Sequence, residues 1–326
     1  MSARRLTIQC LLSLLPLASA ETLELSPLPE GRTFHRAVAL DQQIIVIGGL
    51  TGQSGKGSQR ADLLDLETGK WSTRKLPFKP EAILLPAVIG KQIYVLDPGP
   101  RVLRRYDLKK DQWTKLESPS TSRTNASLAA FQGKLWLIGG YNEEVTKEKS
   151  VESYDPESDS WQKAPPLPDF EKTDHFHLAA TIGDQLHVVG HYFGGKSHWA
   201  FDGSSWTRRA DAPAECGWKS AALAAADGRL FLIQSPLTHP EQGKDGVFTY
   251  SPDEDRWDPA GAVPDGFPFI LAADASTGKQ IFILGGQPAP SAVFVYDVAT
   301  RRWHAPTRPD ARKKQPAKES GRNTPD

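Results

Sequence analysis

Residues 135–140 read LWLIGG, and they are followed by Tyr154-Asp155 and then by Trp161. A related order of an apolar run, small residues, an aspartate after an aromatic or leucine, and a tryptophan recurs along the chain. The tryptophans follow one another at intervals of 42 to 51 residues, at Trp71, Trp113, Trp161, Trp206, Trp257 and Trp303. A self-similar period of this length is typical of propellers and solenoids. Six copies predict six repeats.

A run of small apolar residues precedes each of these segments and predicts an innermost strand. The runs are residues 37–40, 85–89, 128–131, 178–182, 221–226 and 270–273. A four-stranded antiparallel blade cannot bury both of its faces alone, so the blades must stack around a common axis. The sequence therefore predicts an all-β, six-bladed β-propeller with four antiparallel strands per blade, in which the tryptophans pack between blades.

The arrangement of di-glycine, Tyr-Asp and Trp resembles the kelch repeat, over about 280 residues, and it is most complete at residues 139–161. The di-glycine is replaced by Asp97-Pro98, Gly190-His191 and Gln234-Ser235 in three copies. The resemblance implies a kelch-type propeller, most of which bind proteins or glycans through one loop face. A weaker resemblance is to the exported kelch-type N-acetylneuraminate epimerases.

The sequence leaves two ways to close the ring. Residues 25–29 (LSPLP) resemble residues 164–168 (APPLP), which follow the predicted outer strand of the third repeat. The N-terminal segment then adds an outer strand to the last blade, or it is a lead-in and the last blade is complete through Trp303. The first alternative is the one we favour.

The ends of the chain differ from the repeats. Residues 1–20 carry two arginines, an apolar run and Ala18-Ser19-Ala20, which together predict a cleaved signal peptide. Residues 21–305 form the propeller, and residues 306–326 form a basic tail that we expect to be disordered. The signal peptide predicts a secreted or periplasmic protein. Cys216 alone remains after removal of Cys10, so no intramolecular disulfide can form, which favours a bacterial source.

Charge excludes some partners. Without Arg4 and Arg5 the chain has 37 basic and 39 acidic residues, which gives no footprint for nucleic acid. No later segment is apolar enough to predict a membrane span. We expect a monomer without a cofactor, and a protein or carbohydrate as its ligand.

The candidate ligand site lies in the loops that lead into the inner strands. One equivalent position before each strand holds Arg32, Glu81, Arg123, Asp174, Trp218 and Phe269, and neighbouring loop positions add Tyr141, His175 and Tyr192. Arginines, carboxylates and aromatic rings suit a sugar or an acidic peptide. If Arg32 and Arg123 bind ligand, their replacement with alanine should weaken binding with little loss of stability.

Sequence motifs for catalysis are sparse. The chain contains no Gly-x-Ser-x-Gly elbow and no phosphate loop, nothing pairs Cys216 with a base, and His175 and His177 lack the spacing of a metal motif. We therefore assign no catalytic or metal-binding residue and expect an exported, non-catalytic binding module. The alternative is a periplasmic sugar mutarotase or epimerase, in which Glu81 or Asp174 moves a proton and the two arginines hold a sugar carboxylate.

Overall fold

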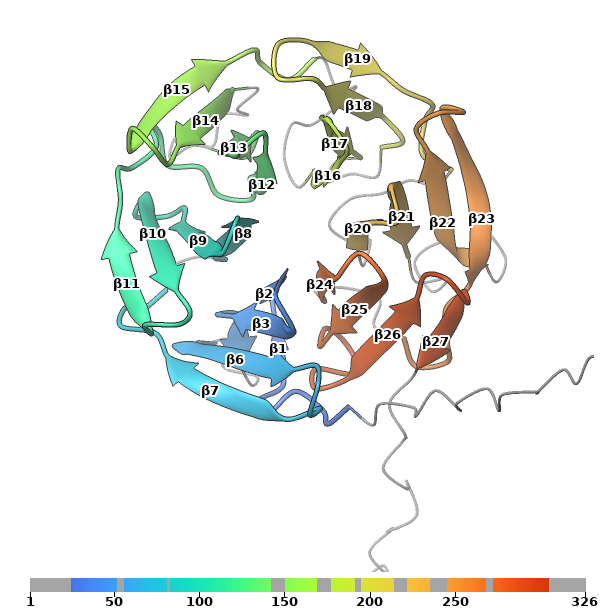
Figure 1. Ribbon diagram of the computed structural model, residues 1–326, viewed down its shortest axis with the longest axis horizontal. Coiled ribbons are helices and arrows are strands. Elements are labelled where there is room, and N and C mark those ends of the chain that lie inside the picture. The colour runs from blue at the N-terminus through green and yellow to red at the C-terminus, as the bar shows by residue number, and fades with distance from the viewer. Residues whose placement is uncertain are drawn as a thin grey trace, which may run out of the picture.

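The computed structural model describes residues 25–51, 56–80, 83–141, 150–168, 177–190, 195–213, 222–234, 245–267 and 272–304. Six antiparallel sheets of four strands each are arranged around one axis (Figure 1). The prediction of an all-β, six-bladed propeller is confirmed. The termini assigned to the signal peptide and the basic tail lie outside the described residues, so those assignments stay predictions. No helix in the described part of the chain is long and apolar enough to cross a membrane.

The strands of each blade follow one another in sequence from the axis outward. Blade one contains β2 (Arg36–Leu40), β3 (Gln43–Ile47), β6 (Arg60–Asp65) and β7 (Trp71–Lys75). Blade two contains β8 (Leu85–Ile89), β9 (Gln92–Asp97), β10 (Val102–Asp107) and β11 (Gln112–Lys115), and blade three contains β12 (Ser127–Phe131), β13 (Lys134–Ile138), β14 (Val151–Asp155) and β15 (Ser160–Ala164).

Blade four contains β16 (Leu178–Ile182), β17 (Gln185–Val189), β18 (His198–Phe201) and β19 (Trp206–Arg208). Blade five contains β20 (Ala222–Ala226), β21 (Arg229–Ile233), β22 (Asp245–Ser251) and β23 (Arg256–Ala262), and blade six contains β24 (Ala273–Ser276), β25 (Gln280–Leu284), β26 (Val293–Asp297) and β27 (Arg302–His304). The short strands β1 (Arg32–Thr33), β4 (Leu50–Thr51) and β5 (Lys56–Gly57) form a small separate sheet beside blade one.

The six innermost strands form a closed ring. Each of β2, β8, β12, β16, β20 and β24 contacts the next, and β24 contacts β2. Their small side chains permit this crowding, as predicted. The innermost strand of blade six is Ala273–Ser276, whereas the sequence predicted residues 270–273. The apolar run before Ala273 misled the prediction, because it continues the hydrophobic pattern up to the first polar residue, Asp274.

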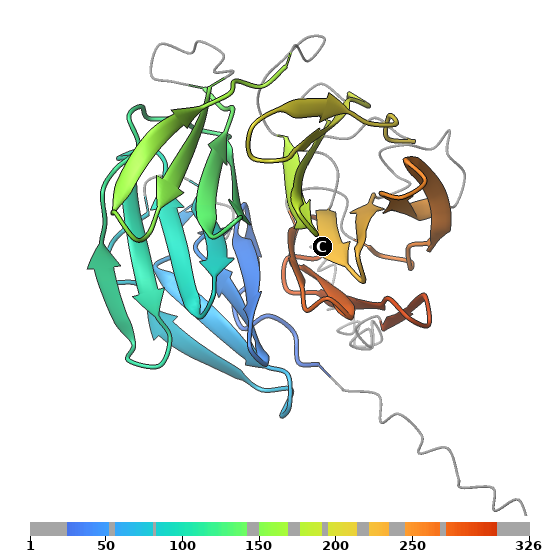
Figure 2. The same cartoon turned by 45° about the horizontal axis from the view of Figure 1, so that its top comes forward.

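Buried side chains fill the spaces between neighbouring blades, where the sheets pack face to face (Figure 2). The repeated aromatic residues also pack within each blade: Tyr106 stacks on Trp113 in blade two with ring centroids 4.5 Å apart, and Phe201 lies 4.7 Å from Trp206 in blade four. The indole of Trp161 also donates a hydrogen bond of 2.9 Å to the Glu117 carbonyl of the preceding blade. These contacts support the assignment of the tryptophans to inter-blade packing.

The favoured mode of ring closure is wrong, and the alternative holds. Blade six is complete through β27, and residues 25–31 are a lead-in without a blade strand. Trp71 donates to the Ser26 carbonyl, just as Trp206 donates to the Pro165 carbonyl. The lead-in thus resembles residues 164–168 because it supplies the carbonyl that accepts the hydrogen bond of the next blade's tryptophan. In blade four this carbonyl comes from the segment that follows the outer strand of blade three. Its buried Leu28 fills the space between blades six and one.

The di-glycine allows the chain to approach the loop before the inner strand. Gly49 and Gly140 both adopt positive φ, at 90° and 101°. A Cβ at Gly49 would lie 2.8 Å from the Thr33 carbonyl oxygen, and one at Gly140 would lie 2.8 Å from the Thr124 oxygen. The two copies therefore need glycine for both backbone conformation and space.

Candidate functional site

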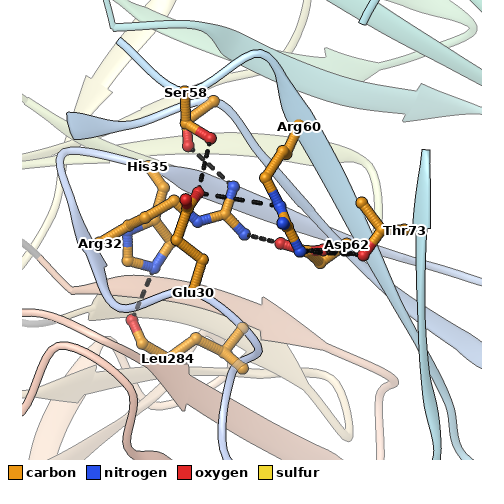
Figure 3. Close-up of polar contacts among 9 residues, drawn as sticks. Glu30, Arg32, His35, Ser58, Arg60, Asp62, Thr73 and Leu284 are labelled. Atoms are coloured by element: carbon orange, nitrogen blue, oxygen red, sulfur yellow. Dashed lines mark hydrogen bonds and ion pairs between the residues drawn. The ribbon is translucent and has the colours of Figure 1, made fainter. Parts of the chain in front are cut away.

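The first arginine of the predicted ring, Arg32, is completely enclosed in blade one. Its Nη1 donates to the Gly48 carbonyl at 3.0 Å, and its Nη2 forms an ion pair with Asp62 of β6 (Figure 3). Neither side chain is exposed to solvent. Burial lowers the pKa of the Arg32 guanidinium, and the Asp62 carboxylate opposes that effect. Arg32 is thus a structural cation held by its own blade.

Asp62 is the centre of a wider polar network. It also accepts hydrogen bonds from Arg60 Nη2 at 2.8 Å and from Thr73 Oγ1 at 2.6 Å. The half-exposed Arg60 lies 3.7 Å from Glu30, which accepts a bond from Ser58 Oγ at 3.0 Å (Figure 3). These side chains join the lead-in to strands of blade one.

Blade three repeats the buried pair. Arg123 Nη2 donates to Glu152 at 2.5 Å, and its Nη1 donates to the Ser150 carbonyl at 2.7 Å. Glu152 lies opposite Leu137 and Asp62 lies opposite Val46, each two residues before a di-glycine, so the two carboxylates are equivalent. The guanidinium groups predicted to face a ligand are therefore already bound within their blades.

The remaining members of the predicted ring are placed unevenly. Tyr141 is half-buried, and its backbone forms a bridge to Thr124 with both N···O distances at 2.8 Å, directly beside Arg123. The other predicted members lie outside the described residues: Glu81, Asp174, His175, Tyr192, Trp218 and Phe269. The ring as a ligand site stays a prediction.

Two equivalent histidines help to fix the loops before the inner strands. His35 Nε2 lies 2.9 Å from the Leu284 carbonyl of blade six, and His177 Nδ1 lies 2.6 Å from the Gly190 carbonyl. Burial, with a further contribution from Arg32, lowers the pKa of His35 to about 3. His35 is therefore a neutral link across the ring closure. The described residues contain no group of three or more His, Cys, Asp or Glu side chains arranged for a metal ion.

Sequence reasoning missed two charged residues on the innermost strands. Arg36 begins β2 and Asp274 is the second residue of β24, and no other residue of the six inner strands, as the structure defines them, is charged. Arg36 pairs with Ile47 and Asp274 pairs with Ile283, so Asp274 lies one residue deeper from the loop face. Although β2 and β24 are neighbours, Arg36 shares with Ile47 the face of β2 toward blade two, and Asp274 shares with Ile283 the face of β24 toward blade five.

Their environment differs from that of Arg32. Both residues are partly exposed to solvent. Arg36 Nη1 donates to the His35 carbonyl at 3.1 Å. Among the described residues, neither Arg36 nor Asp274 forms an ion pair within 4.0 Å.

The two residues nevertheless affect each other electrostatically. Burial raises the pKa of Asp274 to about 6, and the positive charge of Arg36 counteracts part of that rise. Burial lowers the pKa of Arg36, and Asp274 opposes this shift. The two charges are therefore coupled electrostatically without forming a close ion pair. In the sequence the two charges adjoin the predicted strands, Arg36 directly before residues 37–40 and Asp274 directly after residues 270–273.

Comparisons with known proteins agree with this architecture. A family model described as "Kelch motif" matches residues 31–74 and 122–168. Kelch-like protein 35 of Mus musculus is 25% identical over 286 residues, which cover 83% of this chain and 47% of that protein. Kelch-like protein 36 of Mus musculus is 28% identical over 234 residues, covering 64% and 36%. The chain spans less than half the length of these relatives.

A solved structure, "Structure of YjhT", superposes with a TM-score of 0.68 and 14% sequence identity. The match covers 86% of this chain and 99% of that one, and it reflects the fold alone. The fold and its repeats define a six-bladed β-propeller. Residues 31–74 and 122–168 carry the kelch motif, so the propeller is built with kelch repeats.

Proposed function

We propose that this chain is an exported, non-catalytic binding module that holds a protein or glycan ligand through its loop face. The observation that carries the proposal is the difference in charge pairing near that face. Arg32 and Arg123 are neutralised inside their blades, whereas Arg36 and Asp274 lie without close ion pairs among the described residues. A partly exposed, unpaired cation and anion on an otherwise uncharged ring favour recognition of a polar group.

Export is part of the proposal. It rests on the arginines, the apolar run and the Ala-Ser-Ala sequence within residues 1–20. The secreted or periplasmic environment would expose the loop face to extracytoplasmic glycans and proteins.

A sugar mutarotase or epimerase remains the second candidate, and one observation favours it. The carboxyl of Asp274 has a pKa of about 6, and a general acid or base works best when its pKa is near the working pH. In this second candidate, Asp274 joins Glu81 and Asp174 as a residue that could move a proton. Arg32 and Arg123 no longer serve to hold a substrate carboxylate, because each is already paired with a carboxylate of its own blade.

A thermal-shift screen of residues 21–326 against neutral and acidic sugars, with pull-down from the native envelope as its protein arm, tests the proposal. A ligand at a hundred times its Kd stabilises a fold by about 2.7 kcal/mol, which such a screen detects. We expect a glycan that raises the melting temperature, or a protein that the pull-down captures through the loop face.

NMR of each sugar hit then separates binding from catalysis. Anomers that exchange at the uncatalysed rate in the presence of the protein fit a binding module. Acceleration of anomer exchange would contradict the non-catalytic proposal and favour the second candidate.

A further inference from the structure

We infer that the interface between blades four and five is acid-sensitive, because protonation of a buried histidine pair, His187 and His198, opens the contact between the two blades. His187 lies on β17 and His198 begins β18, and both side chains are fully buried. Their face of blade four packs against Tyr250 and Trp257 of blade five, and both imidazoles contact the Tyr250 ring. This property of the fold goes beyond the proposed function and does not depend on the ligand.

The other five interfaces have no histidine at the equivalent positions. His187 corresponds to the third residue of each second strand, and His198 corresponds to the residue paired with the last apolar residue of that strand. In every blade these two side chains face the next blade. The equivalents of His187 are Ile45, Tyr94, Trp136, Phe231 and Phe282, and those of His198 are Ala61, Leu103, Val151, Val247 and Val293. The histidine pair is therefore not part of the repeated packing.

The hydrogen bonds fix which nitrogen of each imidazole carries the proton. His198 Nδ1 lies 3.2 Å from the Ala210 carbonyl, and a carbonyl oxygen only accepts, so Nδ1 is the donor. In the neutral ring Nε2 is then an acceptor, and it lies 2.9 Å from His187 Nδ1. His187 therefore donates from Nδ1 and has a bare Nε2, which is buried and without a hydrogen-bond partner among the described residues.

An added proton has no acceptor in the closed interface. On His187 it would turn the enclosed Nε2 into a donor without a partner. On His198 it would put a second N–H against His187, whose own proton would then have to move to the same enclosed Nε2. A buried charged group without its hydrogen-bond partner is strongly unfavourable. The proton therefore binds readily only when the blades separate enough to admit water.

Charged groups from both blades act on the pair, and burial outweighs them. Burial lowers the pKa of His187 to about 3, with further contributions from His198 and from the positive charge of Arg209. Burial also lowers the pKa of His198 to about 4, where Arg209 and Arg208 act in the same direction. Asp255 of blade five opposes both shifts. A solvated histidine has a pKa near 6.5, so the closed interface is most stable above that pH and weakens as the pH falls below it.

The interface contains its own reporter of closure. The Ala210 amide donates to Asp255 Oδ1 across the two blades at 2.9 Å, so its hydrogen exchanges with solvent when the blades part. The interface between blades two and three has the same link, from the Glu117 amide to Asp159 Oδ1 at 3.0 Å, but no histidine at either equivalent position. The Glu117 amide is thus an internal control for unfolding of the whole ring.

Amide hydrogen exchange at pH 7.5 and pH 5.0, expressed as protection relative to the intrinsic rate at each pH, tests the inference. One histidine whose pKa rises to about 6.5 on opening favours the open interface by roughly 30-fold over this range, and two histidines favour it by more. Protection of the Ala210 amide should therefore fall at least roughly 30-fold further than that of the Glu117 amide. Nitrogen NMR of the two imidazoles at pH 7.5 should find both protons on Nδ1.

A double variant isolates the histidines. His187→Phe with His198→Val gives blade four the side chains that blade five has at these positions, Phe231 and Val247. In this variant, protection of the Ala210 amide should change with pH no more than that of the Glu117 amide. The control His304→Asn replaces an exposed histidine, and it should behave like the wild type.

Two exchange results would overturn the inference. The first is an equal loss of protection at Ala210 and Glu117 in the wild type, and the second is a selective loss at Ala210 that persists in the double variant. The wild-type comparison and the NMR assignment need no variant, so they decide the matter even if the double variant does not fold. A proton on Nε2 of either histidine at pH 7.5 would contradict the hydrogen bonding on which the inference rests.

Discussion

Arg32 and Arg36 lie four residues apart in one segment of the chain, yet the fold treats their identical side chains in opposite ways. Arg32 is fully buried, bonded to Gly48 and paired with Asp62. Arg36 is partly exposed and forms one described hydrogen bond, to the carbonyl of the intervening His35. The first arginine holds a blade together, whereas the second forms no close ion pair among the described residues.

The comparison shows how to use a repeat when looking for a site. The Arg32 pair recurs in blade three as Arg123 and Glu152, so it belongs to the blade. Arg36 corresponds to Ala273 of blade six and Asp274 corresponds to Ala37 of blade one, according to the strand register. A charge that stands in one copy where another copy has alanine is not part of the repeated packing, and it needs a separate explanation.

The largest expected effect contrasts the two arginines directly. Arg32→Leu leaves the buried Asp62 carboxylate without its main partner, and breaking such a pair costs about 3–5 kcal/mol of unfolding free energy. Arg36→Leu should change that free energy by less than about 1 kcal/mol, because its side chain is partly exposed. Urea unfolding at pH 7 measures both. This result would reverse the sequence-based expectation that Arg32 can be replaced with little loss of stability.

The double variant Arg32→Leu with Asp62→Leu is the matched control. Replacement of both partners by apolar residues avoids the uncompensated charge, so the double variant should be more stable than Arg32→Leu alone. Similar losses in Arg32→Leu and Arg36→Leu would contradict the distinction between a structural and an available arginine.

The sequence predicted the blades far better than it predicted the site. Tryptophan, di-glycine and Tyr-Asp recur because every blade solves the same packing problem, so alignment of the copies reveals them. Alignment also led to Arg32 and Arg123, but it could not show that Asp62 and Glu152 neutralise them across a blade. Those contacts join residues 29 or 30 positions apart. Asp274 was missed because the predicted strand ended one residue before it.

The next test is the pH dependence of the unfolding free energy that comes from the buried His35. Its pKa is about 3 in the folded protein against 6.5 for an ordinary histidine, so the unfolded chain gains a proton first on acidification. The contribution of His35 to stability is complete above pH 6.5 and is lost as the pH falls toward 3. At pH 5 the loss is about 2 kcal/mol, at 1.36 kcal/mol per pH unit.

Comparison with a variant that does not titrate isolates this effect. The difference in unfolding free energy between wild type and His35→Asn should shift by about 2 kcal/mol between pH 8 and pH 5, to the disadvantage of the wild type. The exposed His304, replaced in the same way, is the control. A difference that stays constant over this range would show that His35 is not held neutral by its surroundings.

Asp274 should have the smallest effect on the unfolding free energy, and its pH dependence should be opposite in sign to that of His35. Its pKa is about 6 in the folded protein against 3.8 in the reference state, so between pH 4 and pH 6 the folded protein binds the proton more tightly. The wild type therefore loses stability as the pH rises through this window, by about 1–2 kcal/mol after allowance for partial solvent exposure. Asp274→Asn removes the loss, so its stability relative to wild type should increase by about that amount from pH 4 to pH 8.

Urea unfolding without ligand measures this difference, and a flat profile would show that Asp274 is well solvated or paired in the folded protein. A relative stability of Asp274→Asn that increases with pH would show that the charged form of Asp274 destabilises the folded protein. His35 and Asp274 would then respond to the same acidification in opposite directions, one because its surroundings are complete without a charge and the other because its charge lacks a close partner.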